Sequence, residues 1–273
     1  MSTILDRIVE QTREDLQRRK KRLNWRDLDS FPRFERPRRG FRNALIGEPL
    51  SVIAEIKRAS PSQGVIREPF DPVSIARGYE KGGASCLSVL TDEPFFKGSL
   101  RYLEQVSDTV SIPLLRKDFL VDPWQVKEAR AHGADAVLVI ASVTSDALID
   151  ELLDAAREFE LDVLVECYSE QEVDRMDWNR VNLFGVNNRD LHTFEVDLHR
   201  GVSLLQQAPK DVVRVSESGL SRAEDLAWLS TQGIDAALIG EYFMRAEEPG
   251  TALETLLVDM EHKLDRTNDK PRP

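Results

Sequence analysis

From residue 51 onward, short runs of aliphatic and β-branched residues alternate with longer segments whose apolar positions have helical spacing. The runs are residues 51–57, 85–91, 112–118, 134–141, 162–168, 182–188, 212–218 and 235–241. Strand–helix alternation repeated eight times predicts a parallel sheet with helical crossovers, closed into a single α/β barrel of the (β/α)8 TIM type. A doubly wound open sheet is the alternative fold for the same pattern.

The segment before residue 49 has a different pattern. Leu5, Ile8, Val9 and Leu16 are spaced as one face of a helix, and a proline- and arginine-rich stretch follows. We therefore predict an N-terminal helical extension, residues 1–48, that packs onto the barrel; a mobile solvated arm is the alternative. We expect residues 1–265 to form one domain, followed by a disordered tail at 266–273.

Length and composition narrow the function classes. The 273 residues suit one barrel, and the net charge of −11 argues against nucleic acid as a partner. The sequence has no apolar run near 18 residues and no signal-peptide pattern at its start, so we expect no membrane partner and a cytoplasmic location. Cys86 and Cys167 lie in apolar runs and are expected to be buried thiols. Neither the cysteines nor the four histidines have metal-ligand spacing, so we expect no metal. We also expect the chain to be a monomer.

Polar residues gather at the C-terminal ends of the expected strands, the rim where barrels of this kind place their active sites. Glu55 and Lys57 are two positions apart and so share one face of the first strand. Later strands end with Lys117, Glu166, Asn187, Arg189, Glu217 and Ser218. The N-terminal ends show no matching set. One charged strand end is usually a solvated edge, but a group of them on one rim indicates an active site.

A second pattern follows the last two strands, where Ser218-Gly219 and Gly240-Glu241 stand. Loops at these positions of a barrel often bind phosphate through backbone N–H groups, and glycine allows close approach of the backbone. Ser60, after the first strand, either adds a hydroxyl to the site or shapes its loop. Cations, carboxylates and a phosphate site together suit a small phosphosugar substrate with a second anionic group.

The motifs at these strand ends resemble those of the indole-3-glycerol phosphate synthase family. They are AEIKRASPSQG (54–64), LSVLTDEPFFKGS (87–99), LLRKDFLVDPWQVKEARAHGADAVLVI (114–140), LVECYSEQE (164–172), GVNNRDLHTFEVD (185–197), SESGL (216–220) and LIGEYFMR (238–245). The resemblance implies a cofactor-free carboxy-lyase. Its reaction closes, decarboxylates and dehydrates 1-(2-carboxyphenylamino)-1-deoxyribulose 5-phosphate to indole-3-glycerol phosphate in tryptophan biosynthesis.

The resemblance also implies a role for each site residue. Lys117 would be the general acid for ring closure, and Glu166 and Lys57 would handle later proton transfers. Lys57 would also attract the substrate carboxylate. The supporting catalytic residues would be Glu55, Asn187 and Glu217. The other substrate contacts would be Ser60, Phe96, Phe119, Leu138, Arg189 and Leu191, with Ser218, Gly219, Gly240 and the Glu241 backbone at the phosphate.

One local departure from the family pattern stands after the last strand. A small or hydroxylated residue is expected after Gly240, or Glu followed by Ser, whereas this chain has Glu241-Tyr242. A carboxylate would repel phosphate unless its side chain turns away. The alternatives to the family activity are another phosphate-binding barrel such as phosphoribosylanthranilate isomerase, a lyase that uses a lysine Schiff base, and a non-catalytic barrel subunit.

Overall fold

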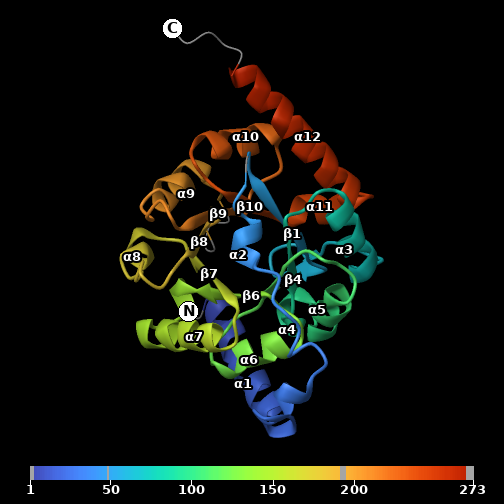
Figure 1. Ribbon diagram of the computed structural model, residues 1–273, viewed down its shortest axis with the longest axis vertical. Helices are drawn as coiled ribbons and strands as arrows, with labels where there is room; N and C mark the ends of the chain where they lie inside the picture. The colour runs from blue at the N-terminus through green and yellow to red at the C-terminus, as the bar shows by residue number, and fades with distance from the viewer. Residues whose placement is uncertain (1–2, 48, 191–194, 269–273) are drawn as a thin grey trace.

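The computed structural model describes residues 3–47, 49–190 and 195–268, and it contains a closed eight-stranded parallel barrel (Figure 1). The barrel strands are β1 (Ser51–Ile56), β4 (Cys86–Leu90), β5 (Leu114–Lys117), β6 (Ala136–Ile140), β7 (Asp162–Cys167), β8 (Leu183–Asn187), β9 (Val213–Glu217) and β10 (Ala236–Ile239). Each strand pairs with the next, and β10 pairs in parallel with β1, from Ser51 opposite Ala236 to Ala54 opposite Ile239. The closed barrel is therefore confirmed, and the open sheet is excluded.

Helices surround this ring of strands (Figure 1). The outer helices are α3 (Pro72–Lys81), α5 (Leu100–Ser107), α6 (Trp124–Ala131), α7 (Asp146–Glu158), α8 (Glu170–Val173), α9 (Leu198–Leu205), α10 (Ala223–Thr231) and α12 (Pro249–Asn268). Short elements follow the strand ends, namely β2 (Ala59–Ser60), β3 (Gly64–Val65), α4 (Glu93–Phe96), η2 (Ala141–Val143) and α11 (Glu241–Arg245). Several helices begin at a side-chain cap: Asp71, Ser145 and Asp197 each accept a backbone N–H of the following turn.

Alternation along the strands divides the core into two layers. Inward-facing residues such as Ile53, Leu115 and Leu164 fill the barrel, while outward-facing aliphatic residues pack under the helices. Cys86 lies in the inner layer and Cys167 in the outer one, and both are buried free thiols, as predicted. Burial raises the pKa of both thiols far above the ordinary value, so neither is a reactive nucleophile.

The N-terminal extension consists of α1 (Ile4–Arg22), η1 (Asp27–Ser30) and α2 (Phe41–Ala44). Ile8 and Leu16 of α1 are buried, and Leu16 packs in a cluster with Trp124 of α6, so the helix lies on the barrel as predicted. In Figure 1, α2 lies over the centre of the ring of strands. There the fully buried Phe41 packs against residues of the inner layer. α2 thus closes the end of the barrel opposite the polar rim.

The expectation that the N-terminal strand ends carry no polar set was wrong. Asp135, Asp162 and Asp235 precede or begin three strands, and each accepts at least one backbone N–H group. The two carboxylate oxygens of Asp135 accept hydrogen bonds from the backbone N–H groups of Arg39 and Leu114, at 2.8 and 2.9 Å. These aspartates bind the backbone of the extension and of neighbouring strands, so their role is structural. Sequence patterning does not separate such carboxylates from solvated ones.

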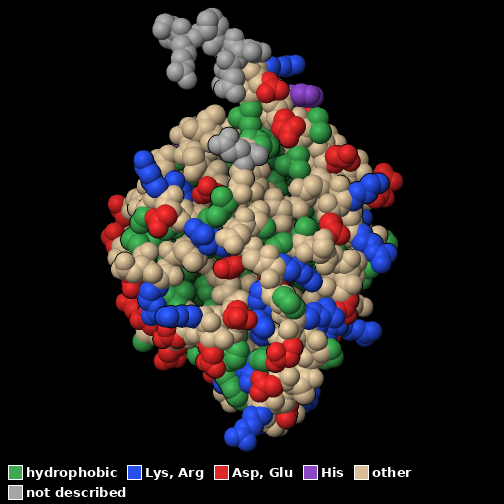
Figure 2. All heavy atoms as spheres, in the orientation of Figure 1, with side chains coloured by type: hydrophobic (Ala, Val, Ile, Leu, Met, Phe, Trp, Pro, Cys, Tyr) green, Lys and Arg blue, Asp and Glu red, His purple; other side chains and the backbone are tan. Residues whose placement is uncertain are grey.

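The C-terminal helix α12 continues to Asn268. Residues 266–268, the first three of the predicted tail, are therefore helical, and its last five residues, 269–273, lie outside the described part of the chain. Acidic and basic side chains are interspersed over the face shown in Figure 2. Among the described residues, no helix combines the length and apolar character needed to cross a bilayer.

Candidate active site

A cavity of about 680 Å³ opens at the C-terminal ends of the strands. Every site residue predicted from the sequence lines it except Leu191, which lies outside the described residues. These are Glu55, Lys57, Ser60, Phe96, Lys117, Phe119, Leu138, Glu166, Asn187, Arg189, Glu217, Ser218, Gly219, Gly240 and Glu241. The closed barrel brings together residues that are up to 186 positions apart, from Glu55 to Glu241, because all parallel strands end at one rim.

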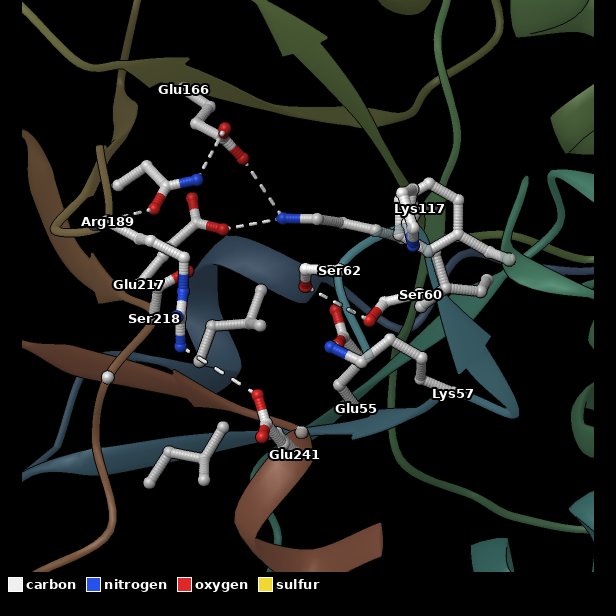
Figure 3. A pocket seen from close by; sticks show the side chains of 18 of the residues that line it. Glu55, Lys57, Ser60, Ser62, Lys117, Glu166, Arg189, Glu217, Ser218 and Glu241 are labelled. Carbon is white, nitrogen blue, oxygen red and sulfur yellow. Dashed lines mark hydrogen bonds and ion pairs between the residues drawn. The ribbon is translucent and has the colours of Figure 1, made fainter. Parts of the chain in front are cut away.

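Lys117, the last residue of β5, is at the centre of the ion-pair network (Figure 3). Its Nζ lies 2.6 Å from Oε2 of Glu217 and 3.1 Å from Oε2 of Glu166. These two glutamates stand at the C-terminal ends of β9 and β7. Burial alone would lower the pKa of this ammonium, but the charges of Glu217, Glu166 and Glu55 outweigh burial and raise it. Lys117 therefore remains positively charged at neutral pH.

A second ion pair lies on β1 and its C-terminal end. Nζ of Lys57 lies 2.5 Å from Oε1 of Glu55, and the two side chains share one face, as their spacing predicts. Burial acts to raise the pKa of Glu55, but the positive charges of Lys57 and Lys117 outweigh it and lower the pKa. Glu55 is therefore an ionised carboxylate that couples the two lysines electrostatically.

The pKa of Glu217 shifts in the opposite direction to that of Glu55, although both side chains are buried. Burial raises the pKa of Glu217 to about 8, because Lys117 only partly offsets the loss of solvent and the nearby Glu166 adds a like charge. On the other side of Glu166, Nδ2 of Asn187 donates to Oε1 at 3.3 Å. Three carboxylates thus share two ammonium groups, an arrangement that holds protons ready for transfer.

The loop after β9, one of the two predicted phosphate-binding loops, has an unusual backbone. Ser218 and Gly219 both have left-handed φ angles, 70° and 74°, and this conformation is strained for a serine. Asn188 stabilises the turn, because its Nδ2 donates to Ser216 Oγ at 2.9 Å and to the Ser218 carbonyl at 3.1 Å. The strain is at a place where a turned backbone can present N–H groups to an anion.

The side chain of Glu241, which sequence analysis left in doubt, is bound by two arginines. Nε and Nη2 of Arg245 donate to its Oε1 at 3.1 and 3.0 Å, and Nη2 of Arg189 lies 3.8 Å from its Oε2 (Figure 3 shows the Arg189 pair). The guanidinium groups offset the carboxylate, so this end of the cavity keeps one net positive charge from the three side chains.

Apolar side chains form one wall of the same cavity. The rings of Phe96 and Phe119 have centroids 6.1 Å apart, and Leu138 lies with Phe119 in the inner cluster. Sequence analysis missed one part of this wall, since Ile4, Leu5 and Ile8 of α1 also line the cavity. Their apolar stripe predicted a packed helix, but nothing in its spacing indicated that the helix packs at the active rim.

Among residues 3–47, 49–190 and 195–268, no group of three or more His, Cys, Asp or Glu side chains is placed to hold a metal ion. What the cavity does offer is acid–base chemistry beside an apolar wall, with an ammonium group positioned to stabilise negative charge as it develops on a substrate.

Comparison with known proteins gives a family match over most of the chain. The family model described as indole-3-glycerol phosphate synthase matches residues 5–256. An indole-3-glycerol phosphate synthase from Salinibacter ruber is 48% identical over 256 residues, which cover 93% of this chain and 95% of that protein.

Solved structures show the same fold at low sequence identity. The tryptophan synthase alpha subunit of Legionella pneumophila has a TM-score of 0.59 at 14% identity, covering 85% of this chain and all of that one. A thiamine phosphate pyrophosphorylase from Pyrococcus furiosus has a TM-score of 0.59 at 15% identity, covering 79% of this chain and 98% of that one. At such identities the likeness extends to the barrel architecture alone.

Proposed function

The chain belongs to the indole-3-glycerol phosphate synthase family, the decarboxylating lyases of tryptophan biosynthesis, and we propose that its rim cavity performs the family's ring closure through Lys117. The observation that carries this proposal is the position of the Lys117 ammonium between Glu166 and Glu217, in a cavity that apolar side chains also line. The substrate is the small phosphosugar 1-(2-carboxyphenylamino)-1-deoxyribulose 5-phosphate.

Ring closure needs the ribulose carbonyl to become electrophilic toward the aromatic ring. In the proposed mechanism Lys117 donates its proton to the carbonyl oxygen as negative charge grows there. A preplaced ammonium stabilises that charge without reorganising solvent, which makes it effective in a partly dry cavity. Glu217 and Glu166 hold the ammonium in place, and Glu217 can return a proton to the neutral Lys117 amine afterwards when its own carboxyl group is protonated.

The later steps are assigned to the groups beside Lys117. Lys57 attracts the substrate carboxylate until carbon dioxide leaves, and Glu55 orients Lys57 through their 2.5 Å ion pair. Glu166 and Lys57 then move the protons that dehydration requires. Asn187, which donates to Glu166, keeps that carboxylate directed into the cavity.

Substrate positioning is the second part of the proposal. The substrate must fold back on itself, and anchoring it at both ends brings the reacting carbons together. The loops at Ser218–Gly219 and Gly240–Glu241 would bind the phosphate, with Arg189 beside them and Ser60 across the cavity. Phe96, Phe119 and Leu138 would hold the anthranilate ring, and we keep Leu191 as a candidate for the same wall.

The competing activities lack support from the family match. Residues 5–256 include Lys57, Lys117 and Glu166, and the matched family is that of the synthase, not of the isomerase. A non-catalytic barrel would have no need for a buried set of lysines and glutamates at its rim. The monomeric state, the cytoplasmic location, the single-domain boundaries and the lack of a cofactor and of a nucleic-acid partner stay predictions.

A Lys117→Ala variant tests the proposed mechanism. We expect kcat for indole formation, followed by fluorescence, to fall about 10³-fold, because the variant loses both proton donor and charge stabilisation. Circular dichroism should show an unchanged fold. The matched control is Lys81→Ala, which removes an exposed lysine at the end of α3 and should leave kcat unchanged. Near-normal turnover by Lys117→Ala would remove Lys117 from its role as general acid.

A further inference from the structure

Two of the rim glutamates lie against glycines of neighbouring strands. Glu217 of β9 lies beside Gly185 of β8, and Glu55 of β1 lies beside Gly240, which follows β10. In both places the carboxylate occupies the space in which any other residue would have its Cβ atom. Glycine in a strand interior weakens the strand, so its presence often marks a close approach of another group.

The contact at Gly185 bears more directly on the proposed reaction, because Glu217 pairs with Lys117. Gly185 lies between Leu183 and Asn187 on the inward face of β8. A Cβ atom on Gly185 would approach Oε1 of Glu217 well inside the 3.0 Å that real Cβ contacts keep. It would also lie 3.1 Å from Cδ1 of Leu164, a fully buried residue of the inner layer. The added methyl group would therefore press mainly on the Glu217 carboxylate.

The carboxylate of Glu217 has little freedom to move aside. Its Oε2 lies 2.6 Å from the Lys117 ammonium, and its side chain is 2% exposed. Among the described residues, Oε1 has no hydrogen-bond partner and lies in the buried space over Gly185. Any rotation that removed Oε1 from a methyl group would therefore also move Oε2, and with it the ammonium of Lys117.

We propose that Gly185 is a positioning residue for the reaction, because the space left by its missing side chain holds the Glu217 carboxylate and thereby directs Lys117 into the cavity. Gly185 itself does not touch the substrate in this account. The inference rests on the proposed roles of Lys117 and Glu217. It adds a requirement on the barrel wall beneath them, where close packing transmits small displacements.

A double-mutant cycle with Gly185→Ala and Glu217→Ala tests the proposal. Gly185→Ala alone should lower kcat about tenfold or more and change KM less, because a displaced proton donor costs rate more than binding. In the Glu217→Ala background the same change should alter kcat less than about twofold, since the methyl group then has room. Equal losses in the two backgrounds, or no loss in either, would overturn the inference.

The cycle also separates this inference from the proposed function. If Glu217→Ala and Lys117→Ala both retained full activity, the proposed mechanism would fail. If these variants kept only a small, measurable part of the activity while Gly185→Ala was fully active, only the positioning role would fail. The pH profile of kcat is a readout that a general loss of stability does not change. Gly185→Ala should shift the inflection of this profile, because the Lys117–Glu217 pair is displaced. In the Glu217→Ala background, Gly185→Ala should cause no such shift.

Folding of the variants provides the remaining control. If Gly185→Ala does not fold, Gly185→Ala/Glu217→Ala should fold and melt within a few degrees of Glu217→Ala; failure of both would assign the clash to Leu164 and overturn the proposal. Gly78→Ala is the matched glycine control. Its Cβ atom would lie 3.6 Å from the Gly250 backbone, an ordinary contact outside the active site, so kcat should not change.

Discussion

At the rim, more acidic than basic side chains take part in the central ion-pair network. Glu55, Glu166 and Glu217 share Lys57 and Lys117, and all five line one cavity. With three carboxylates for two ammonium groups, one carboxylate is the natural proton acceptor, and the most buried of them, Glu217, has its pKa raised by burial to about 8. The site thus stores a proton beside the proposed general acid, at a cost to the stability of the fold.

That cost predicts a pH-dependent effect of Glu217→Gln. A carboxyl group whose pKa rises from 4.5 to about 8 on folding stabilises the fold fully below pH 4.5, and this contribution is lost as the pH rises through 8. The glutamine variant has no such proton. Its melting temperature should therefore exceed that of the original chain by more at pH 8.5 than at pH 5, as calorimetry can measure. A difference that stayed constant with pH would contradict the raised pKa.

The residues of the site were largely predictable because strand ends are readable in the sequence. Lys117, Glu166 and Glu217 each end an apolar run, and a barrel brings such ends together. The Arg245 contact to Glu241 was not predictable, since it depends on where α11 begins. The contact between Gly185 and Glu217 was not predictable either, because a glycine inside a strand gives no sign of which neighbour approaches it.

Among the elements, α1 connects the surface of the barrel to its active site. Its first turns place Ile4, Leu5 and Ile8 in the cavity wall, and its last turns bind α6 and the residues before it. Nη1 of Arg19 lies 2.7 Å from Oε2 of Glu128, which is 2% exposed and also pairs with the fully buried Arg116. Arg116 directly precedes Lys117, so the position of α1 and that of β5 depend on one buried carboxylate.

Arg19→Ala should therefore loosen α1 and weaken substrate binding. We expect KM to rise about fivefold, the equivalent of about 1 kcal/mol, with a smaller change in kcat. Lys20→Ala is the control on the same helix, because Lys20 pairs with Asp122 at 2.5 Å where both side chains are about 30% exposed, and exposed pairs contribute little. Equal KM values for the two variants would show that the buried network does not position α1.

At the scale of the whole molecule, the two ends of the barrel have different tasks. The C-terminal rim carries the cavity, whereas the N-terminal rim carries Phe41 and the aspartates that bind backbone N–H groups. The barrel and its extension were predictable because the strand–helix alternation and the apolar stripe of α1 are strong signals. Closure of the N-terminal end was not, since it depends on hydrogen bonds that backbone N–H groups donate to carboxylates, and these carboxylates look solvated in the sequence.

This division predicts that stability and activity can be changed separately. Asp135→Ala would leave the N–H groups of Arg39 and Leu114 without their acceptor in a buried place, which should cost about 3 kcal/mol of unfolding free energy. Since Asp135 lies at the end of the barrel opposite the cavity, kcat and KM at 25 °C should stay within about twofold. Chemical denaturation and steady-state kinetics on the same preparation measure both quantities. A loss of kcat as large as that of an active-rim variant would mean that the closed end determines the geometry of the open one.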